Sequence, residues 1–158
     1  MSVNVDARVV EPGDDDYLQE AWELKERIRK EEGVLRQRWG FFADAYRTAR
    51  ANLYFVDDEL VGFAVTRRDG YLLFLGVSPD YQGQGFGRRL LADVAENYRT
   101  VSCHARTTNQ KALDFYESVG FERVRRIDNY YEDGGSAHYL KLGQRDGFTD
   151  KLQRLFSG

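Results

Sequence analysis

The residues with the clearest chemical potential form a glycine-rich segment in the middle of the chain. Gln82-Gly83-Gln84-Gly85-Phe86-Gly87 follows a hydrophobic run that ends at Pro79, and it precedes a helical pattern. Glycine has no Cβ, so backbone N–H groups can converge on a ligand, and the start of a helix adds the positive end of its dipole. The segment therefore predicts an anion site, with phosphate as the first candidate.

The spacing of the glycines narrows the kind of phosphate ligand. A dinucleotide-binding loop needs G-x-G-x-x-G and an acidic residue about 20 positions later, but the glycines here are alternate and Cys103-His104-Ala105 occupies the acidic position. A nucleoside triphosphate loop ends in G-K-[ST], whereas Gly87 is followed by two arginines. The remaining prediction is a pyrophosphate held by backbone amides, without a metal.

Two motifs resemble signatures of the GNAT superfamily of N-acetyltransferases. Gln82-x-x-Gly85-x-Gly87, after a strand ending in Val77-x-Pro79, is similar to the acetyl-CoA loop of that family. Residues 109–121 match its second signature, N-x-x-A-x-x-F-Y-x-x-x-G-F, at every fixed position. The resemblance spans residues 50 to 142, and it implies an acetyl-CoA-dependent acyltransferase that uses no metal.

Transfer of an acetyl group from a thioester to an amine needs a neutral amine, a stabilised oxyanion and a proton for the leaving thiolate. An alkyl ammonium titrates at about 10 and a peptide N-terminus at about 8, so a base or a water chain to one is required. The resemblance implies that amides around Leu75, Gly76 and Val77 meet the oxyanion and that Tyr116 supplies the proton. The alternative for Tyr116 is an aromatic side chain that only packs.

The base is implied by a narrower resemblance. Residues 71–87 and 101–121 align without gaps to N-terminal acetyltransferases of the NatE type, and the motifs are also similar to ribosomal-protein-alanine acetyltransferases. The positions that correspond to their catalytic bases are Tyr71 and His104. Alternation independently places His104 on the more polar face of its strand and Cys103 on the apolar face, where we expect Cys103 to pack. A structural role for His104, with a water chain as the base, is the alternative.

Further residues are implied in binding the two substrates. Acetyl-CoA binding is expected at Leu75, Gly76, Val77, Gln82, Gly83, Gln84, Gly85, Phe86, Gly87, Arg88, Asn109, Ala112 and Phe115. For Asn109 a helix cap is the alternative. Acceptor binding is expected at Trp39, Phe41, Tyr130, Tyr131 and His138, although the aromatic residues near 40 could simply fill the core.

These residues require a frame of alternating elements. We expect a single GNAT domain over residues 1–158, of class α/β (α+β), with helices on both faces of one mixed central sheet of about seven strands. Strands four and five are expected to be parallel and splayed, because a helix joins them. The expected strands are 3–10, 53–56, 60–67, 71–77, 101–105, 121–127 and 137–142. The expected helices run from the acidic triplet to Gly33, behind Gly40, and over 85–99, 109–118 and 146–156.

Local signals fix several element ends. Asp14-Asp15-Asp16 is expected to cap the first helix rather than to bind a metal, and Gly33 and Gly120 are expected to end helices. Asp57-Asp58-Glu59 is expected to form a hairpin turn, and Arg68-Asp69-Gly70 a second turn.

Composition excludes several classes of protein. A net charge of −3 argues against nucleic-acid binding, and the lone Cys103 allows no internal disulfide. No apolar run of about 18 residues and no signal-peptide pattern is found, so we expect a soluble, cytoplasmic protein without membrane contact.

The acceptor is the open question. A protein N-terminal α-amine is the first expectation, and a small-molecule amine or lysine is the alternative. The alternative from another functional class is a non-catalytic acyl-CoA-binding module that acts through a partner. The sequence also leaves open whether the protein forms a homodimer.

Overall fold

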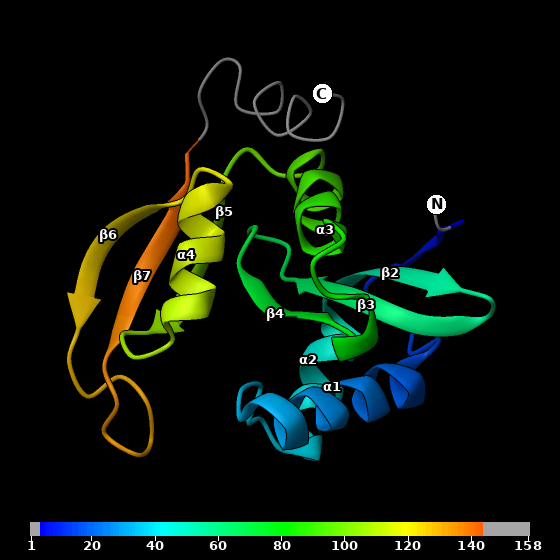
Figure 1. Ribbon diagram of the computed structural model, residues 1–158, viewed down its shortest axis with the longest axis horizontal. Helices are drawn as coiled ribbons and strands as arrows, with labels where there is room; N and C mark the ends of the chain where they lie inside the picture. Colours follow the sequence, from blue (N-terminus) through cyan, green and yellow to red (C-terminus); the bar gives the residue numbers. More distant parts are fainter. Residues whose placement is uncertain (1–3, 144–158) are drawn as a thin grey trace. The chain divides into compact units, whose positions relative to one another are not determined.

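The computed structural model describes residues 4–143, which fall into two compact units divided between Val94 and Ala95 (Figure 1). The elements of the first unit are β1 (Asp6–Val10), α1 (Leu18–Glu32), α2 (Trp39–Thr48), β2 (Arg50–Val56), β3 (Glu59–Thr66), β4 (Leu72–Val77), a 3-10 turn (Pro79–Tyr81) and α3 (Phe86–Ala95). Those of the second are β5 (Val101–Arg106), α4 (Gln110–Ser118), β6 (Glu122–Ile127) and β7 (Ala137–Leu142). The helix expected over 146–156 lies outside the described residues.

The first unit is built on an antiparallel sheet in the order β1-β2-β3-β4. The turn between β2 and β3 has Asp57 and Asp58 at φ 50° and 63°, both left-handed, as a two-residue hairpin of the type I′ class requires. Gly70, at φ 87°, makes the turn into β4. Both predicted turns are confirmed, and the sheet leaves β4 as an edge strand.

Helices α1 and α3 pack on opposite faces of this sheet (Figure 1). A Cβ placed on Gly76 of β4 would lie 2.8 Å from Ile28 Cδ1 of α1 and 2.9 Å from Phe63 Cζ. A Cβ placed on Gly62 of β3 would lie 3.2 Å from Leu90 Cδ1 of α3. Each glycine therefore makes room for a helix on its own face of the sheet.

The start of α1 differs from the expectation. Tyr17 is the N-cap residue of the helix at φ 64°, and its side chain makes no capping hydrogen bond. This left-handed residue stands between the acidic triplet and the helix, so the predicted cap by Asp14-Asp15-Asp16 is wrong. The end of the helix is confirmed, because Gly33 is left-handed and its N–H donates to the Arg29 carbonyl.

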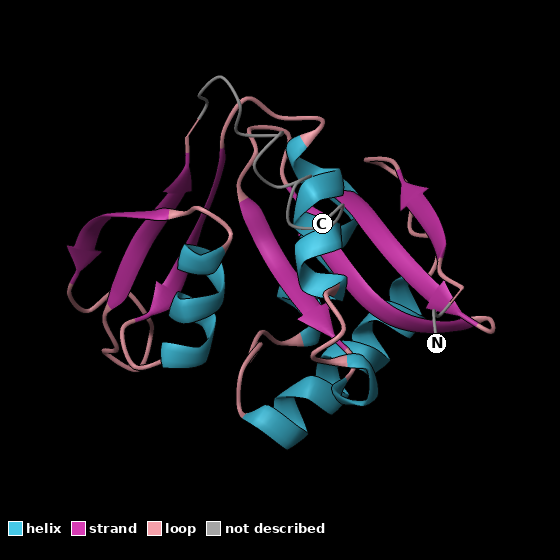
Figure 2. Cartoon of the chain, turned by 45° about the horizontal axis from the view of Figure 1, so that its top comes forward, coloured by secondary structure: helices cyan, strands magenta, loops and turns pink. Residues whose placement is uncertain are grey.

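The second unit holds a separate antiparallel sheet in the order β5-β7-β6, with α4 along one face (Figure 2). The described residues thus form two sheets rather than one, because no strand of one sheet is hydrogen-bonded to a strand of the other. Helix α3 ends at Ala95 instead of Arg99, just before Asn97, a weak helix former. Among residues 4–143, no helix is long and apolar enough to cross a membrane.

Candidate active site

The glycine loop presents backbone rather than side chains. Gly83 and Gly85 adopt φ 80° and 84°, and among the described residues a Cβ added to either would meet nothing within 4 Å beyond its chain neighbours. The Arg89 N–H donates to the Gly85 carbonyl, so α3 begins here, and its first turn has no acidic residue. Because the first N–H groups of a helix have no intrahelical acceptors, this loop can hold an anion such as a pyrophosphate.

The other residues expected to bind acetyl-CoA in this loop differ in how deeply they are buried. Phe86 is buried, and its ring stacks on Tyr81 at 5.9 Å between centroids. Gly87 and Arg88 are half-buried, while Gln84 is exposed. Phe86 therefore anchors the start of α3, and only its backbone is available to a ligand.

Strand β4 offers two outward amide groups. The Ser78 N–H donates to the Val61 carbonyl of β3, so by alternation Gly76 also faces β3, whereas Leu75 and Val77 direct their backbone groups away from it. Consistent with this, the Val77 carbonyl accepts a hydrogen bond from the Gln82 side chain at 3.1 Å. Of the three predicted oxyanion donors, only the N–H groups of Leu75 and Val77 point away from β3. The glycine at position 76 is explained by its close packing against α1.

Helix α1 braces the segment that leads into the glycine loop. The Arg27 guanidinium donates to both carboxylate oxygens of Asp80, at 3.1 and 3.0 Å, and to Ser78 Oγ at 3.3 Å. The Gln82 amide donates to Glu32 at 2.7 Å. The contact with Arg27 holds the pKa of Asp80 below its usual range, so the pair stays charged at neutral pH. Sequence reasoning missed this brace, since Arg27 and Asp80 are far apart in the chain.

Arg27→Ala is expected to weaken acetyl-CoA binding about five-fold, with a smaller effect on turnover at saturation, because the loop loses its fixed position. Titration calorimetry with acetyl-CoA measures the change. Arg29→Ala is the matched control, since Arg29 lies on the same helix and pairs with Glu26 at 2.8 Å rather than with the loop. Equal affinities in both variants and the wild type would contradict the brace.

The first turn of α2 carries exposed aromatic side chains. Trp39 is 41% exposed and Phe41 59%, whereas Phe42 is fully buried in the core. The core alternative is therefore right for Phe42 and does not describe Trp39 and Phe41. Lys25, which the sequence analysis missed, is completely buried. Its ammonium lies over the Trp22 ring, 4.6 Å from the centroid, and donates to the Gln37 carbonyl in the segment before α2. Burial lowers the pKa of Lys25, opposed by the nearby Glu26.

Tyr71 immediately precedes β4 and is half-buried. Its ring lies under the Arg67 guanidinium, 4.6 Å from the ring centroid, and its N–H donates to Asp69 at 3.1 Å. The other predicted base, His104, belongs to the second unit.

His104 has the burial and partners of a neutral imidazole. Strand β5 alternates strictly between buried and half-buried residues, with Cys103 buried and His104 half-buried, as predicted. The imidazole stacks on Tyr130 at 4.3 Å and tilts against Tyr139 at 5.0 Å. Burial, and then the charge of Arg125, lower the pKa of His104 below its ordinary 6.5. The side chain is therefore uncharged at neutral pH and able to accept a proton.

The hairpin between β6 and β7 is held against β5. The Arg106 guanidinium covers the Tyr131 ring at 4.0 Å and pairs with Asp133 at 3.0 Å. Burial raises the pKa of Tyr131 to about 12. Tyr130 is 42% exposed. The predicted Tyr130 and Tyr131 thus lie beside His104. Tyr139 joins this group and was not predicted, although its pairing with His104 between β5 and β7 would have indicated it.

His138 does not join this group. It is paired with Ala105 in the β5–β7 register, and its ring lies 3.5 Å from the Arg123 guanidinium. Neighbouring residues of a strand point to opposite faces, so His138 lies on the face opposite to Tyr139.

Tyr116 lies half-buried on α4, between Phe115 at 5.3 Å and Phe121 at 5.1 Å. Burial raises the pKa of the Cys103 thiol to about 12, and the Tyr116 side chain opposes this rise. Cys103 is thus a packed, protonated thiol, as expected. Asn109 caps α4 by accepting from the Ala112 N–H at 3.1 Å, which confirms the capping alternative.

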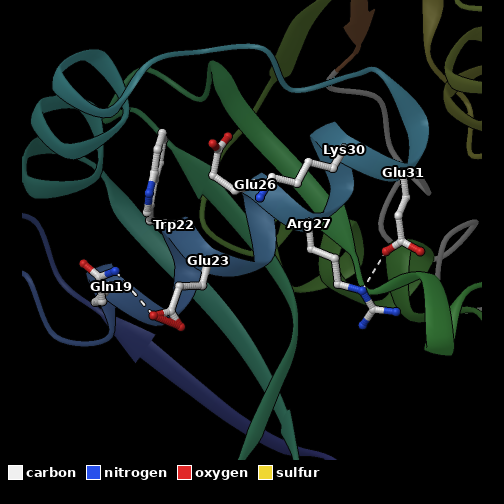
Figure 3. Close-up of a pocket in the computed structure, with 7 residues that line it drawn as sticks. All are labelled: Gln19, Trp22, Glu23, Glu26, Arg27, Lys30 and Glu31. Carbon is white, nitrogen blue, oxygen red and sulfur yellow. Dashed lines mark hydrogen bonds and ion pairs between the residues drawn. The ribbon is translucent and has the colours of Figure 1, made fainter.

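A shallow hollow on the surface of α1 is formed by side chains of that helix alone (Figure 3). Within it Gln19 bonds to Glu23 at 3.4 Å and Arg27 to Glu31 at 2.7 Å. Because it includes no residue of the glycine loop or of β4, we assign it no part in the chemistry.

A helix N-terminus opened by left-handed glycines, next to an edge strand with outward amides, can hold an acylated pyrophosphate cofactor. Comparison with known proteins agrees. Residues 24–142 match the Acetyltransferase (GNAT) domain family, and the chain belongs to this family.

Individual relatives support the same assignment. The N-alpha-acetyltransferase RimI of Mycobacterium tuberculosis is 45% identical over 67 residues, which cover 41% of this chain and 42% of that protein. The crystal structure of the Escherichia coli ribosomal-protein-S18-alanine N-acetyltransferase has a TM-score of 0.72 and 24% identity, covering 88% of this chain and 94% of that one. Arabidopsis thaliana Naa50, in complex with the bisubstrate analogue CoA-Ac-MVNAL, has a TM-score of 0.66 and 26% identity, covering 88% and 98%. The chain spans less than half of several curated relatives, from 26% to 42% of their length.

Proposed function

We propose that this protein is an acetyl-CoA-dependent N-acetyltransferase that acts by direct attack of a primary amine, with a protein N-terminal α-amine as the first acceptor. The observation that carries the proposal is the loop at Gly83 and Gly85, whose backbone is left-handed and unobstructed at the start of α3. The choice of acceptor is supported by the relatives, which include N-alpha-acetyltransferases and a Naa50 bound to a peptide-like bisubstrate analogue.

The proposed mechanism assigns each demand of the reaction to a group of this chain. Acetyl-CoA, when bound, supplies the thioester carbonyl that the amine attacks. The N–H groups of Leu75 and Val77 donate to the carbonyl oxygen as negative charge develops there. His104, with Tyr71, accepts the proton that the amine loses, and Tyr116 gives its hydroxyl proton to the sulfur of the leaving thiolate. The presence of His104, Tyr71 and Tyr116 in one chain supports an enzyme rather than a non-catalytic binding module.

The finer features of the fold belong to the proposal. A single GNAT domain with β4 and β5 parallel and splayed would let Tyr71 and His104 reach one thioester. An extra helix after β7 and a cytoplasmic location are proposed on the sequence pattern.

The test is turnover of acetyl-CoA with a mixture of peptides, followed by mass spectrometry of the products. We expect acetyl groups on peptide α-amines. Acetylation of lysine side chains or small amines alone would replace the proposed acceptor. Binding of acetyl-CoA without turnover of any amine would make the protein a binding module.

His104→Ala should lower turnover and remove the acidic limb of the pH-rate profile. The folded-state pKa of His104 lies below 6.5, so the wild-type rate should hold at pH 7 and fall only when the pH drops through that lower pKa. His138→Ala is the control, because these are the two histidines of the chain. The affinity for acetyl-CoA should stay constant in both variants. A pH-rate profile that His104→Ala leaves unchanged would contradict the role of His104 and leave a water chain as the base.

A further inference from the structure

A β-bulge sorts the arginines of β6 onto opposite faces of the second unit's sheet. Strict alternation would place Arg123 and Arg125 on the same face. The pairing of β6 with β7 shifts between them, so Arg123 is paired with Leu140 and Arg125 with Tyr139. The extra residue, Val124, re-aims the strand, as bulges do. Arg125 is thereby turned to the face of His104, because Tyr139 is also the partner of His104 across β5.

Contacts agree with this assignment of faces. Arg123 donates to Glu117 of α4 at 2.9 Å, which puts it on the face that α4 covers. The Arg125 guanidinium lies instead over the Tyr139 ring, 4.7 Å from the centroid. The Tyr139 ring is in turn 5.0 Å from the imidazole of His104.

Arg125 also differs from its neighbours in its ionic partners. Arg123 pairs with Glu117, Arg126 with Asp128, and Arg106 with Asp133. Within residues 4–143, Arg125 makes no ion pair with a carboxylate, and its side chain is exposed. Stacking on Tyr139 fixes the guanidinium in place while its N–H edge stays available to a planar carboxylate.

The position of Arg125 sets the distance over which it could act. Two strand spacings separate β5 from β6, which corresponds to about 10 Å. An extended peptide advances about 3.4 Å per residue, so a side chain at the second or third position could reach Arg125 when the α-amine is at His104.

We propose that Arg125 is a carboxylate-binding residue of the acceptor site and that the preferred acceptor is a peptide with an acidic residue at its second or third position. This inference rests on the proposed function. The positive charge of Arg125, on one face of the β5-β7-β6 sheet, would then determine which peptides are preferred. This preference should weaken as the salt concentration rises.

The experiment compares two peptides that differ only in Asp or Asn at the second and third positions. The wild type should acetylate the Asp peptide with a kcat/KM about five-fold higher at low salt. Arg125→Glu should reverse this preference. Arg126→Glu is the matched control, because it makes the same change in net charge on the neighbouring residue of the opposite face, and it should keep the wild-type ratio.

Calorimetry with the N-acetylated forms of both peptides repeats the comparison without turnover. A wild-type binding ratio that Arg125→Glu removes supports the carboxylate site even if no peptide is acetylated, in which case only the proposed function fails. Equal binding of the two peptides to the wild type, or equal loss of preference in both variants, would overturn the role of Arg125 even where peptides are acetylated.

Discussion

Replacing Tyr116 by phenylalanine is expected to lower turnover about 10²-fold or more while acetyl-CoA affinity stays unchanged. The substitution removes one hydroxyl and little volume, so the rings of Phe115 and Phe121 keep their neighbour. What is lost is the proton donor for the thiolate, which is needed only as the carbon–sulfur bond breaks. Steady-state kinetics and calorimetry with acetyl-CoA separate the two effects.

The Cys103 thiol, whose pKa Tyr116 lowers, provides the control for this experiment. Cys103→Ala removes the thiol that interacts with Tyr116 and leaves the phenol in place. If Tyr116 acts as the acid, Cys103→Ala should retain most of the turnover that Tyr116→Phe loses. Similar losses in the two variants would reduce the role of Tyr116 to holding β5 and α4 together.

The parts of the site that could be predicted are those encoded by neighbours in the chain. Alternate glycines before a helical pattern predicted the loop at residues 82–87, and two of its three glycines, Gly83 and Gly85, are left-handed. Alternation along β5 placed His104 and Cys103 on the correct faces. In each case the conformation depends on local sterics, which residue type and spacing determine directly.

Features that depend on tertiary packing could not be predicted from the sequence pattern. Tyr17 adopts a left-handed conformation that no local signal indicates, and this moved the start of α1 away from its acidic triplet. The bulge at Val124 reverses the face of Arg125, which a period of two cannot anticipate. No sequence signal marks Lys25 as buried, yet its side chain is completely buried and donates to the Gln37 carbonyl before α2.

Gly85→Val is expected to weaken acetyl-CoA binding by about 3 kcal/mol or more, a change of about 10²-fold in the dissociation constant. Gly85 has a φ of 84°, which a β-branched residue rarely adopts, and its backbone lies where α3 presents free N–H groups. A valine there either moves the loop or places methyl groups in the space intended for phosphate. Apart from its chain neighbours, no atom of residues 4–143 lies within 4 Å of the added Cβ, so overpacking against these residues does not contribute.

The matched control for this variant is Gly13→Val. Gly13 has a φ of 102° and equally open surroundings, but it lies in the turn before α1 rather than in the glycine loop. Both variants should lose stability from the strained backbone, as thermal unfolding would measure, whereas only Gly85→Val should lose affinity in calorimetry. A folded Gly85→Val protein that binds acetyl-CoA as tightly as the wild type would remove the pyrophosphate from this loop. Because strain is matched between the two positions, a selective loss at Gly85 would locate the anion at the start of α3.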